Sequence, residues 1–349
     1  MINLLLVAPQ TNQSQGGMTV WTEAFLSQCS KSEINCDLLN IAMIGSRAVK
    51  GNNKRNFGDE FVRTKAIFKN LKQMLNTQAY HAAHMNTSCG TFGLIRDYLI
   101  VRKIRKKQPK CKCIVHFHCD VKNHTRSKYQ RFFLKKLLNI TDETLVLNES
   151  NVAFLSENCS TGVTAVPNFI DESFVRRHQK AISDDIEHAL FVGFVQPEKG
   201  AREIYELAAR FPTITFDLVG DVRADVKAWE RPGNVVLHGP KDRREVIEFL
   251  DKADVFVFPT HSEGFSIALL ESMSRGLPCI TTPAGANAEM LEGKGGLIVP
   301  IGDVESMARA IDALRDPERR KEMSRWNLEK VEKFYIVDIV MKRIVNLYR

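Results

Sequence analysis

Two glutamates that stand eight positions apart, Glu263 and Glu271, lie around the expected start of a helix. Carboxylates accept hydrogen bonds from hydroxyl groups and stabilise nearby positive charge. The first amides of a helix have no internal acceptor and lie at the positive end of the helix dipole, which favours phosphate there. The chain can therefore present two acids and a row of free amides to one ligand, and this combination suits a nucleotide sugar.

Local patterns on both sides of the pair predict the elements that hold it. Residues 253–258 form a short, mainly apolar run rich in β-branched and aromatic residues, and it ends at Pro259, as expected of a buried strand. A helix follows, because apolar residues recur at helical spacing and a glycine and a proline then mark its end: Ile267, Leu269, Leu270, Met273, Gly276 and Pro278. Residues 279–282 are a second expected strand. The segment is therefore strand, loop, helix, strand.

Within this segment the amides near Phe265, Ser266 and Ile267 are placed to hold a diphosphate. Glu271, two turns into the helix, is placed to accept hydrogen bonds from ribose hydroxyls. As a bare pair, two glutamates eight apart are more often solvent-facing helix residues. Their position between two strands and beside Gly264 favours the site instead. In this context the segment resembles the Glu-x7-Glu signature of retaining glycosyltransferases with the GT-B fold, in particular the large family-4 type.

The resemblance implies an α/β fold of two facing Rossmann-like domains with an interdomain cleft. It also implies roles for the two acids. Glu271 would bind the ribose, and Glu263 would bind donor-sugar hydroxyls or stabilise the positive charge that develops at the anomeric carbon. The resemblance is strong over residues 186–305 and looser over residues 1–25, 111–120 and 144–171.

A second segment, residues 191–200, follows an expected strand and precedes an expected helix. Gly193 lets the backbone approach a ligand closely, and Lys199 can place its ammonium against phosphate oxygens. Alone, such a turn is usually only a turn. The segment resembles the family's Gly-Arg-x4-Lys-Gly, whose two basic residues hold the diphosphate, but Phe194 stands at the arginine position. Lys199 and the helix amides would then stabilise the leaving diphosphate, without a metal, because no Asp-x-Asp or His/Cys ligand spacing is present.

Further positions resemble family site residues. Gly16 and Gly17, after the first strand, look like the glycine loop that lets substrate phosphates approach backbone amides. His118 ends a strand and matches the histidine that contacts the donor sugar. Alternation along the strand puts His116 on the same face, so the sequence does not decide which of the two reaches the site. A strand-end histidine satisfied by its neighbours is the other interpretation. Glu289 resembles a further carboxylate that binds sugar or orders its loop.

Expected strands alternate with helices along the whole chain, which predicts parallel sheets covered on both faces. The connector at residues 166–171 resembles the junction between the halves of GT-B enzymes. We therefore predict an acceptor-side domain of residues 1–169, joined by a C-terminal helix of residues 333–349, and a nucleotide-sugar-binding domain of residues 170–332. Ligands of open α/β sheets bind beyond the carboxyl ends of the strands, which predicts a site between the domains.

Basic residues are concentrated in the first half of the chain. Residues 1–170 carry 23 Lys/Arg against 11 Asp/Glu and residues 171–349 carry 26 against 30, so the formal charge of +8 divides into +12 and −4. Most of this charge lies in residues 101–113, expected as a cationic loop, and in residues 126–136, expected as an amphipathic helix with aromatic residues. Such a helix suits an anionic membrane surface, where each nearby Lys or Arg contributes about 1 kcal/mol. A solvated helix face is an equal alternative, and no nucleic-acid-binding motif accompanies the charge.

Length and composition are those of a globular protein with two cores: 349 residues, 44% apolar and 26% charged. The eight cysteines include no CxxC pair, which favours reduced thiols and a cytoplasmic protein. The first residues lack the charged region of a signal peptide, and no apolar run approaches the roughly 20 residues that span a bilayer. Any membrane association is therefore expected to be peripheral.

The family resemblance implies a retaining glycosyltransferase, and from it we predict one that needs no cofactor. It would move a sugar from a nucleotide-diphosphate sugar, UDP- or GDP-linked, to the hydroxyl of a carbohydrate or lipid-linked acceptor, in polysaccharide or glycolipid synthesis. One alternative is a nucleotide-sugar epimerase or phosphorylase on the same fold. Another is a catalytically silent protein that binds sugars or lipid head groups, with Phe194 as the damaged residue. A dehydrogenase is much less expected, because Gly-x-Gly-x-x-Gly with its acidic partner is missing after the first strand.

Overall fold

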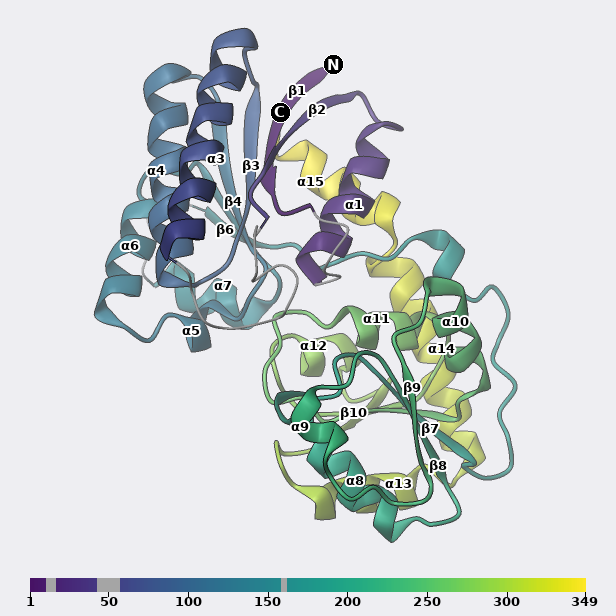
Figure 1. The fold of residues 1–349 in the computed structure, drawn as a ribbon. Coiled ribbons are helices and arrows are strands. Elements are labelled where there is room, and N and C mark those ends of the chain that lie inside the picture. The colour runs from purple at the N-terminus through teal and green to yellow at the C-terminus, as the bar shows by residue number, and fades with distance from the viewer. Residues whose placement is uncertain (11–16, 43–56, 158–161) are drawn as a thin grey trace. The chain divides into compact units, whose positions relative to one another are not determined.

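The computed structural model describes residues 1–10, 17–42, 57–157 and 162–349. These residues form two compact units (Figure 1). Unit 1 comprises Met1–Asn168 and Val340–Arg349, and unit 2 comprises Phe169–Ile339. Within the part of the chain that the structure describes, no helix has both the length and the apolar character needed to cross a membrane.

Unit 1 is built on a six-stranded sheet in which every strand pair is parallel. In their order across the sheet the strands are β2 (Ile34–Asn40), β1 (Ile2–Ala8), β3 (Ala82–Thr87), β4 (Lys112–Phe117), β5 (Glu143–Val146) and β6 (Gly162–Ala165). The consecutive apolar residues of β1 are buried on both faces, as expected of a central strand in a covered parallel sheet.

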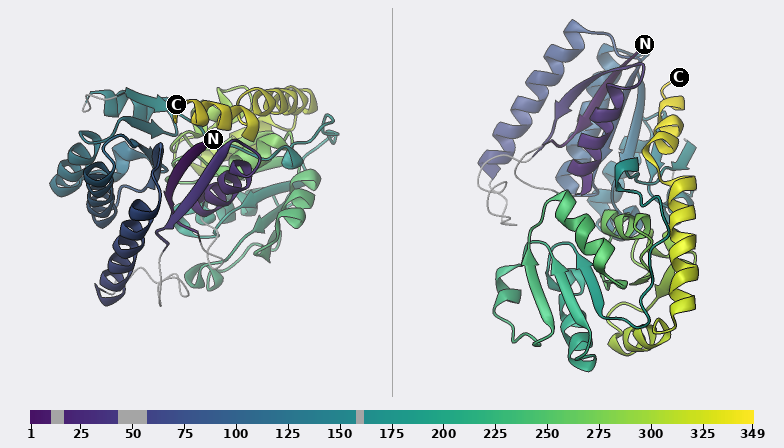
Figure 2. Two further views of the ribbon diagram at one scale, coloured as in Figure 1. Left: turned by 90° about the horizontal axis from the view of Figure 1, so that it is seen from above. Right: turned by 90° about the vertical axis from the view of Figure 1, so that its right-hand side faces the viewer.

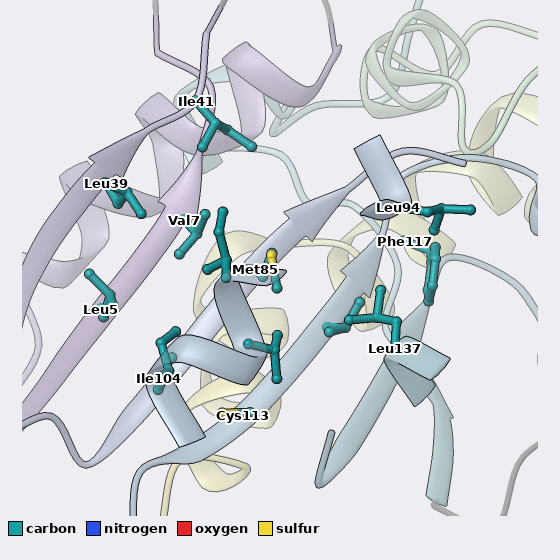
Figure 3. Close-up of a cluster of buried hydrophobic side chains, with 14 of the residues drawn as sticks. Leu5, Val7, Leu39, Ile41, Met85, Leu94, Ile104, Cys113, Phe117 and Leu137 are labelled. Atoms are coloured by element: carbon teal, nitrogen blue, oxygen red, sulfur yellow. The ribbon is translucent and has the colours of Figure 1, made fainter. Parts of the chain in front are cut away.

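Helices cover both faces of this sheet. They are α1 (Gly17–Cys29), α3 (Phe57–Thr77), α4 (Thr91–Lys107), α5 (Val121–His124), α6 (Lys128–Leu138), α7 (Glu149–Ser156) and the C-terminal part of α15 (Val337–Asn346). Side chains of α3, α4 and α6 pack on one face to form a continuous apolar core with Leu5, Met85 and Phe117. Figure 3 shows part of this core, with Leu94 and Ile104 of α4 and Leu137 of α6. On the opposite face, Trp21 of α1 and Tyr348, which follows α15, contact the sheet through His84.

The expected cationic loop at residues 101–113 is instead mostly helical. Residues 101–107 form the last two turns of α4, and only residues 108–111 lie between that helix and β4. The prediction was wrong because Val101 and Ile104 continue the apolar stripe of α4 into the core, while the intervening basic residues face outward or cover its flanks. The basic residues of this run therefore lie mainly on the surface of α4, and α4 packs beside α6.

Unit 2 is also built on a six-stranded parallel sheet. In their order across it, the strands are β12 (Gly296–Ile298), β11 (Cys279–Thr281), β10 (Val255–Phe258), β7 (His188–Val192), β8 (Thr215–Val219) and β9 (Val235–Gly239). From β7 the chain adds β8 and β9 toward one edge of the sheet. It then returns to β10, which lies beside β7, and adds β11 and β12 toward the other edge. Because crossover connections are right-handed, this reversal puts α8 (Ala201–Arg210) and α11 (Ile267–Ser274) on opposite faces of the sheet.

The remaining helices of unit 2 complete these layers. They are η1 (Glu172–Phe174), η2 (Pro197–Lys199), α9 (Ala224–Lys227), α10 (Arg243–Lys252), α12 (Asn287–Leu291), α13 (Val304–Ala313) and α14 (Pro317–Phe334). α13 packs against α8, and the long α14 packs against α11 and runs along the unit (Figure 2).

The helix expected at the C-terminus is interrupted. α14 ends at Phe334, and α15 begins at Val337. Between them Ile336 forms a parallel bridge with Ile170, and the amide of Ile170 donates to the carbonyl of Tyr335 at 2.9 Å. These backbone bonds replace helical ones, which explains the break.

Candidate active site

The predicted donor-binding residues of unit 2 lie at the point where the strand order reverses. β7 and β10 are neighbours in the sheet, but the chain goes from β7 to β8 on one side and from β10 to β11 on the other. Open α/β sheets bind ligands beyond the carboxyl ends of the strands at such reversal points. Lys199 follows β7, and Glu263 follows β10.

The two loops are held together by backbone contacts. Gly200 has a φ of +83°, and a Cβ at this position would lie 2.4 Å from the carbonyl oxygen of Pro259. The amide of His261 donates to the carbonyl of Glu198 at 3.0 Å. Only glycine fits this close approach, so the local backbone fixes the position of the preceding Lys199.

Lys199 and Glu263 form an ion pair between the Lys199 ammonium and the Glu263 carboxylate. Thr260 Oγ1 donates to the same Glu263 oxygen at 3.2 Å, and Lys199 Nζ also donates to the Ser262 carbonyl at 3.4 Å. Both charged side chains remain partly exposed, at 23% and 14%. The sequence suggested separate roles for the two residues but not this contact. The contact places a cation and an anion together beyond the carboxyl ends of β7 and β10.

The loop from Glu263 to α11 presents backbone amides to the same region. Ser266 is the N-cap of α11, and its hydroxyl accepts from the amide of Leu269 at 3.1 Å. The amides of Ile267 and Ala268 are in the first turn and have no acceptor within the helix. Ile267 is therefore confirmed as the start of the helix, whereas Phe265 and Ser266 precede it. The dipole of α11 adds positive potential at this end.

A third loop, which follows β11, contacts the backbone of Glu263 and Gly264. Gly285, after β11, has a φ of +58°, and a Cβ there would lie 2.5 Å from the Glu263 carbonyl oxygen. The amide of Ala286 donates to the Gly264 carbonyl at 3.0 Å. The backbone that carries Glu263 is thus held between the loops that follow β7 and β11.

Glu271 lies on α11, one turn beyond Ile267, and is half-buried. Burial raises the pKa of Glu271 to about 7, and the nearby Arg243 guanidinium acts in the opposite direction. Arg243 is the first residue of α10, and its guanidinium carbon lies 4.8 Å from the centre of the Phe174 ring. Sequence reasoning did not anticipate Arg243, because no local pattern links it to a glutamate 28 residues later.

The remaining predicted residue after β7 is Gly193, whose amide donates to the Val219 carbonyl at 2.9 Å. Phe194 follows it and is 49% exposed. At this position the family that the segment resembles has an arginine. The exposed phenyl ring of Phe194 cannot donate a hydrogen bond to a phosphate.

In unit 1 the structure places His116 and His118 on one face of the sheet, as predicted, with ring centres 4.2 Å apart. His116 is fully buried, and its Nδ1 lies 3.3 Å from Nε2 of His84. His118 is half-buried at the end of β4, and among the described residues its Nε2 has no hydrogen-bond partner. Burial holds the pKa of His118 well below its usual range, so its ring is neutral at pH 7. The Nε2 of His116 also has no partner among the described residues, but His116 is fully buried, so exposure favours His118 as the one that contacts a ligand.

The other predicted residues contribute less. Gly17 is the first residue of α1 and is exposed, and Gly16 lies outside the described residues. Glu289 is an exposed residue of α12. Across residues 1–10, 17–42, 57–157 and 162–349, no group of three or more His, Cys, Asp or Glu side chains is arranged to hold a metal ion.

Comparisons with known proteins agree with this geometry. Residues 173–328 match the family model described as glycosyl transferases group 1. CapM of Staphylococcus aureus, a capsular polysaccharide biosynthesis glycosyltransferase, is 24% identical over 212 residues, which cover 57% of this chain and 56% of CapM. The chain therefore spans a little over half the length of this relative.

Solved structures resemble the chain over nearly its whole length. Sucrose-phosphate synthase from Thermosynechococcus elongatus has a TM-score of 0.81 at 16% identity and covers 100% of this chain and 98% of its own. HepE from Anabaena, in complex with UDP and glucose, has a TM-score of 0.73 at 14% identity and covers 99% of both chains.

The two parallel sheets and these structural likenesses define the class of the protein, which has the GT-B fold. Within this fold, residues 173–328 are similar to the glycosyl transferases group 1 family, and CapM is a relative of the same kind. The fold predicted from the sequence is confirmed, and the family match agrees with the resemblance that the sequence showed.

Proposed function

We propose that this protein is a retaining glycosyltransferase that uses a nucleotide-diphosphate sugar as its donor. The observation that carries the proposal is the Lys199–Glu263 ion pair after the two strands at which the order of the unit 2 sheet reverses, followed directly by the first turn of α11, the helix that carries Glu271. A cation, free amides and two carboxylates correspond to the diphosphate, ribose and sugar of such a donor. The family match over residues 173–328 supports the same conclusion.

Each group has a role that follows from its chemistry. Glu271 accepts hydrogen bonds from the ribose hydroxyls, and Lys199 together with the amides of Ile267 and Ala268 holds the diphosphate. Glu263 binds the donor sugar or stabilises the positive charge at its anomeric carbon. Because Lys199 and Glu263 are already paired, the charges are oriented before the donor arrives, which lowers the reorganisation needed during reaction.

Transfer with retention then needs no separate protein base. The anomeric carbon breaks its bond to the β-phosphate oxygen, and the electron pair stays on that oxygen. The acceptor oxygen attacks from the same face while its proton passes to the leaving phosphate oxygen. Lys199 and the α11 amides stabilise the charge on the departing nucleoside diphosphate, and we assign His118 to a contact with the donor sugar.

A donor screen tests the proposal. Nucleotide sugars, UDP- and GDP-linked first, should raise the melting temperature of the protein, since a ligand that binds only the folded state stabilises it by about 2.7 kcal/mol at 100 times its Kd. The donor that raises it most should also be hydrolysed slowly in the absence of an acceptor. Nucleoside monophosphates, which lack the diphosphate, should have a smaller effect.

The possible outcomes separate the alternatives. Free epimer or sugar phosphate as the product would identify an epimerase or a phosphorylase. Binding without any hydrolysis, and without transfer to added acceptors, would favour the silent binder that exposed Phe194 suggests. A protein stabilised by no nucleotide sugar would contradict the proposal.

We further propose a lipid-linked or polysaccharide acceptor reached at an anionic membrane surface. CapM acts in capsular polysaccharide biosynthesis, which supports a polymer or its lipid-linked intermediate. On α6, Leu134, Leu137 and Leu138 are buried in the core, while Tyr129 and Phe132 are 74% and 53% exposed. The same outer face of α6 carries exposed cations at Lys128, Arg131, Lys135 and Lys136. Exposed aromatic rings among cations suit the interface of an anionic bilayer.

Charge reversal tests this surface. Arg131→Glu combined with Lys135→Glu should reduce binding to phosphatidylglycerol vesicles at least about tenfold, because each basic residue near the surface contributes about 1 kcal/mol. Sedimentation with vesicles measures the effect, and added salt should weaken wild-type binding as well. Lys252→Glu combined with Lys321→Glu, on exposed positions of unit 2, is the matched control. Equal binding to neutral phosphatidylcholine vesicles would contradict an electrostatic membrane contact.

A further inference from the structure

Two cysteine thiols meet beyond the ends of neighbouring strands in unit 1. The Sγ atoms of Cys89 and Cys119 lie 2.7 Å apart. β3 and β4 are paired in register up to Thr87 and Phe117, so each cysteine stands two residues past the end of its strand. The amide of His118 donates to the Thr87 carbonyl at 3.1 Å, which continues the pairing and brings the two segments side by side.

This arrangement satisfies the geometry of a disulfide. Neighbouring strands are about 4.8 Å apart, within the Cα separation of about 4.4–6.8 Å that a disulfide bridges. An S–S bond is about 2.05 Å long, so the two sulfurs need to approach by only about 0.6 Å. Small rotations of the side chains supply such a movement without any change in the backbone.

The two thiols differ in exposure, which sets their order of reaction. Cys89 is 2% exposed, and the Gln130 side-chain amide donates to its carbonyl at 2.8 Å. The hydrogen bond to Cys119 and burial raise the pKa of the Cys89 thiol. Cys119 is half-buried and therefore within reach of a small oxidant. Cys119 is thus the sulfur that reacts first, and Cys89 is held beside it as the resolving thiol.

We propose that Cys89 and Cys119 are a reversible redox-modification site that closes to a disulfide when the protein meets hydrogen peroxide. The Cys119 thiolate attacks one peroxide oxygen, the O–O bond breaks, and sulfenic acid and water form after proton transfer. The Cys89 sulfur then attacks the Cys119 sulfur and displaces the second water. Overall two thiols and one hydrogen peroxide give one disulfide and two waters, and a dithiol reductant reverses the change.

The disulfide has a measurable consequence beyond its chemistry. It closes a loop of about 30 residues that contains α4 and β4, and cross-linking a loop of this size restricts the unfolded chain. Oxidation should therefore raise the melting temperature of unit 1 in the full chain by several degrees. The disulfide should also restrict the motion of the segment that directly follows His118.

Peptide mapping of the full-length protein tests the site. After treatment with a small excess of hydrogen peroxide and alkylation of the remaining thiols, mass spectrometry should show a cross-linked peptide that joins Cys89 and Cys119 and is two hydrogens lighter than the reduced pair. Dithiothreitol should remove both the cross-link and the rise in melting temperature. Because the mapping uses wild-type protein, it needs no variant to fold, and its result does not depend on the proposed glycosyl transfer.

Two variants sharpen the test. Cys119→Ser should abolish both the cross-link and the thermal shift. Cys36→Ser, which removes the other half-buried cysteine among the described residues of unit 1, should leave both unchanged. The proposal is overturned if Cys119 is recovered as sulfinic acid while Cys89 stays alkylated, or if either cysteine cross-links to a different partner.

Discussion

Replacing Glu271 with glutamine should weaken nucleoside-diphosphate binding about tenfold at pH 8, while raising the melting temperature of the ligand-free protein. Glutamine keeps the size of the side chain but removes its charge. Hydrogen bonds to a charged group contribute about 1.5–3 kcal/mol, against about 1 kcal/mol for neutral ones, so two ribose hydroxyls together lose about 1–4 kcal/mol, and roughly 1.4 kcal/mol corresponds to tenfold. Titration calorimetry measures the first effect, and thermal denaturation measures the second.

The opposite sign of the stability effect follows from the pKa of Glu271. Burial raises this pKa to about 7, so the folded protein binds the proton more tightly than the unfolded chain does. The stability that Glu271 contributes is therefore fully present below the unfolded pKa of about 4.3, and it is lost as the pH rises through about 7. Glutamine cannot ionise and avoids this loss. The gain in melting temperature should be largest at pH 8 and should shrink toward pH 5.

Binding should respond to pH in the same window. If the ionised carboxylate is the form that accepts from the ribose, wild-type affinity should fall about tenfold between pH 8 and pH 6, because the ionised fraction falls by that factor around a pKa of about 7. Protonation of the nucleotide phosphates affects wild type and Glu271→Gln alike, so the difference between the two pH profiles isolates Glu271. Glu322→Gln, at an exposed position of α14, should match wild type in every respect. A Glu271→Gln protein with unchanged affinity and turnover would show that the ribose assignment is wrong.

The elements around the two glutamates were predictable because their determinants are local. The strand before Pro259, the helix from Ile267 and the strand from Cys279 each follow from a contiguous run of residues, and the structure confirms all three. Exposure and pKa were not predictable in this way. Glu271 is half-buried because of what packs around α11, including α14, and Arg243 of α10 lies near enough to act on its charge.

Three strands with a weak sequence signal lie at sheet edges. β2 and β6 are the two edges of the unit 1 sheet, and β12 is one edge of the unit 2 sheet. β6 has four residues and β12 has three, and β2 mixes polar and half-exposed residues. An edge strand is covered on fewer sides, so it lacks the continuous apolar run that marked the central strands.

The contact between Lys199 and Glu263 depends on strand order rather than on either local motif. The residues are 64 positions apart, and they meet because β10 returns to lie beside β7. Periodicity indicates that strands exist but does not say which of them are neighbours. The same holds for Cys89 and Cys119, whose contact follows from the register of β3 with β4.

Removing the Lys199 ammonium should have the largest effect on turnover. Lys199→Ala should lower kcat/KM for the donor about 100-fold or more, the size of loss seen when one group that stabilises a developing oxyanion is removed. Affinity for the nucleoside diphosphate should fall as well, because the α11 amides then hold the diphosphate alone. Lys330→Ala is a closely matched control, since Lys330 is also partly exposed, pairs with Glu292 and lies 4.5 Å from an aromatic ring centre at Phe334.

A second substitution separates phosphate binding from the mere positioning of Glu263. Glu263→Gln removes a negative charge beside the diphosphate and frees Lys199, so affinity for the nucleoside diphosphate should stay the same or rise while turnover of the sugar donor falls. If Lys199 acted only by orienting Glu263, Lys199→Ala would reproduce this behaviour, with a low turnover and an undiminished diphosphate affinity. Opposite movements of that affinity in the two variants are what the assignment of Lys199 to the diphosphate requires, because only a direct contact makes the lysine itself necessary for holding the phosphates.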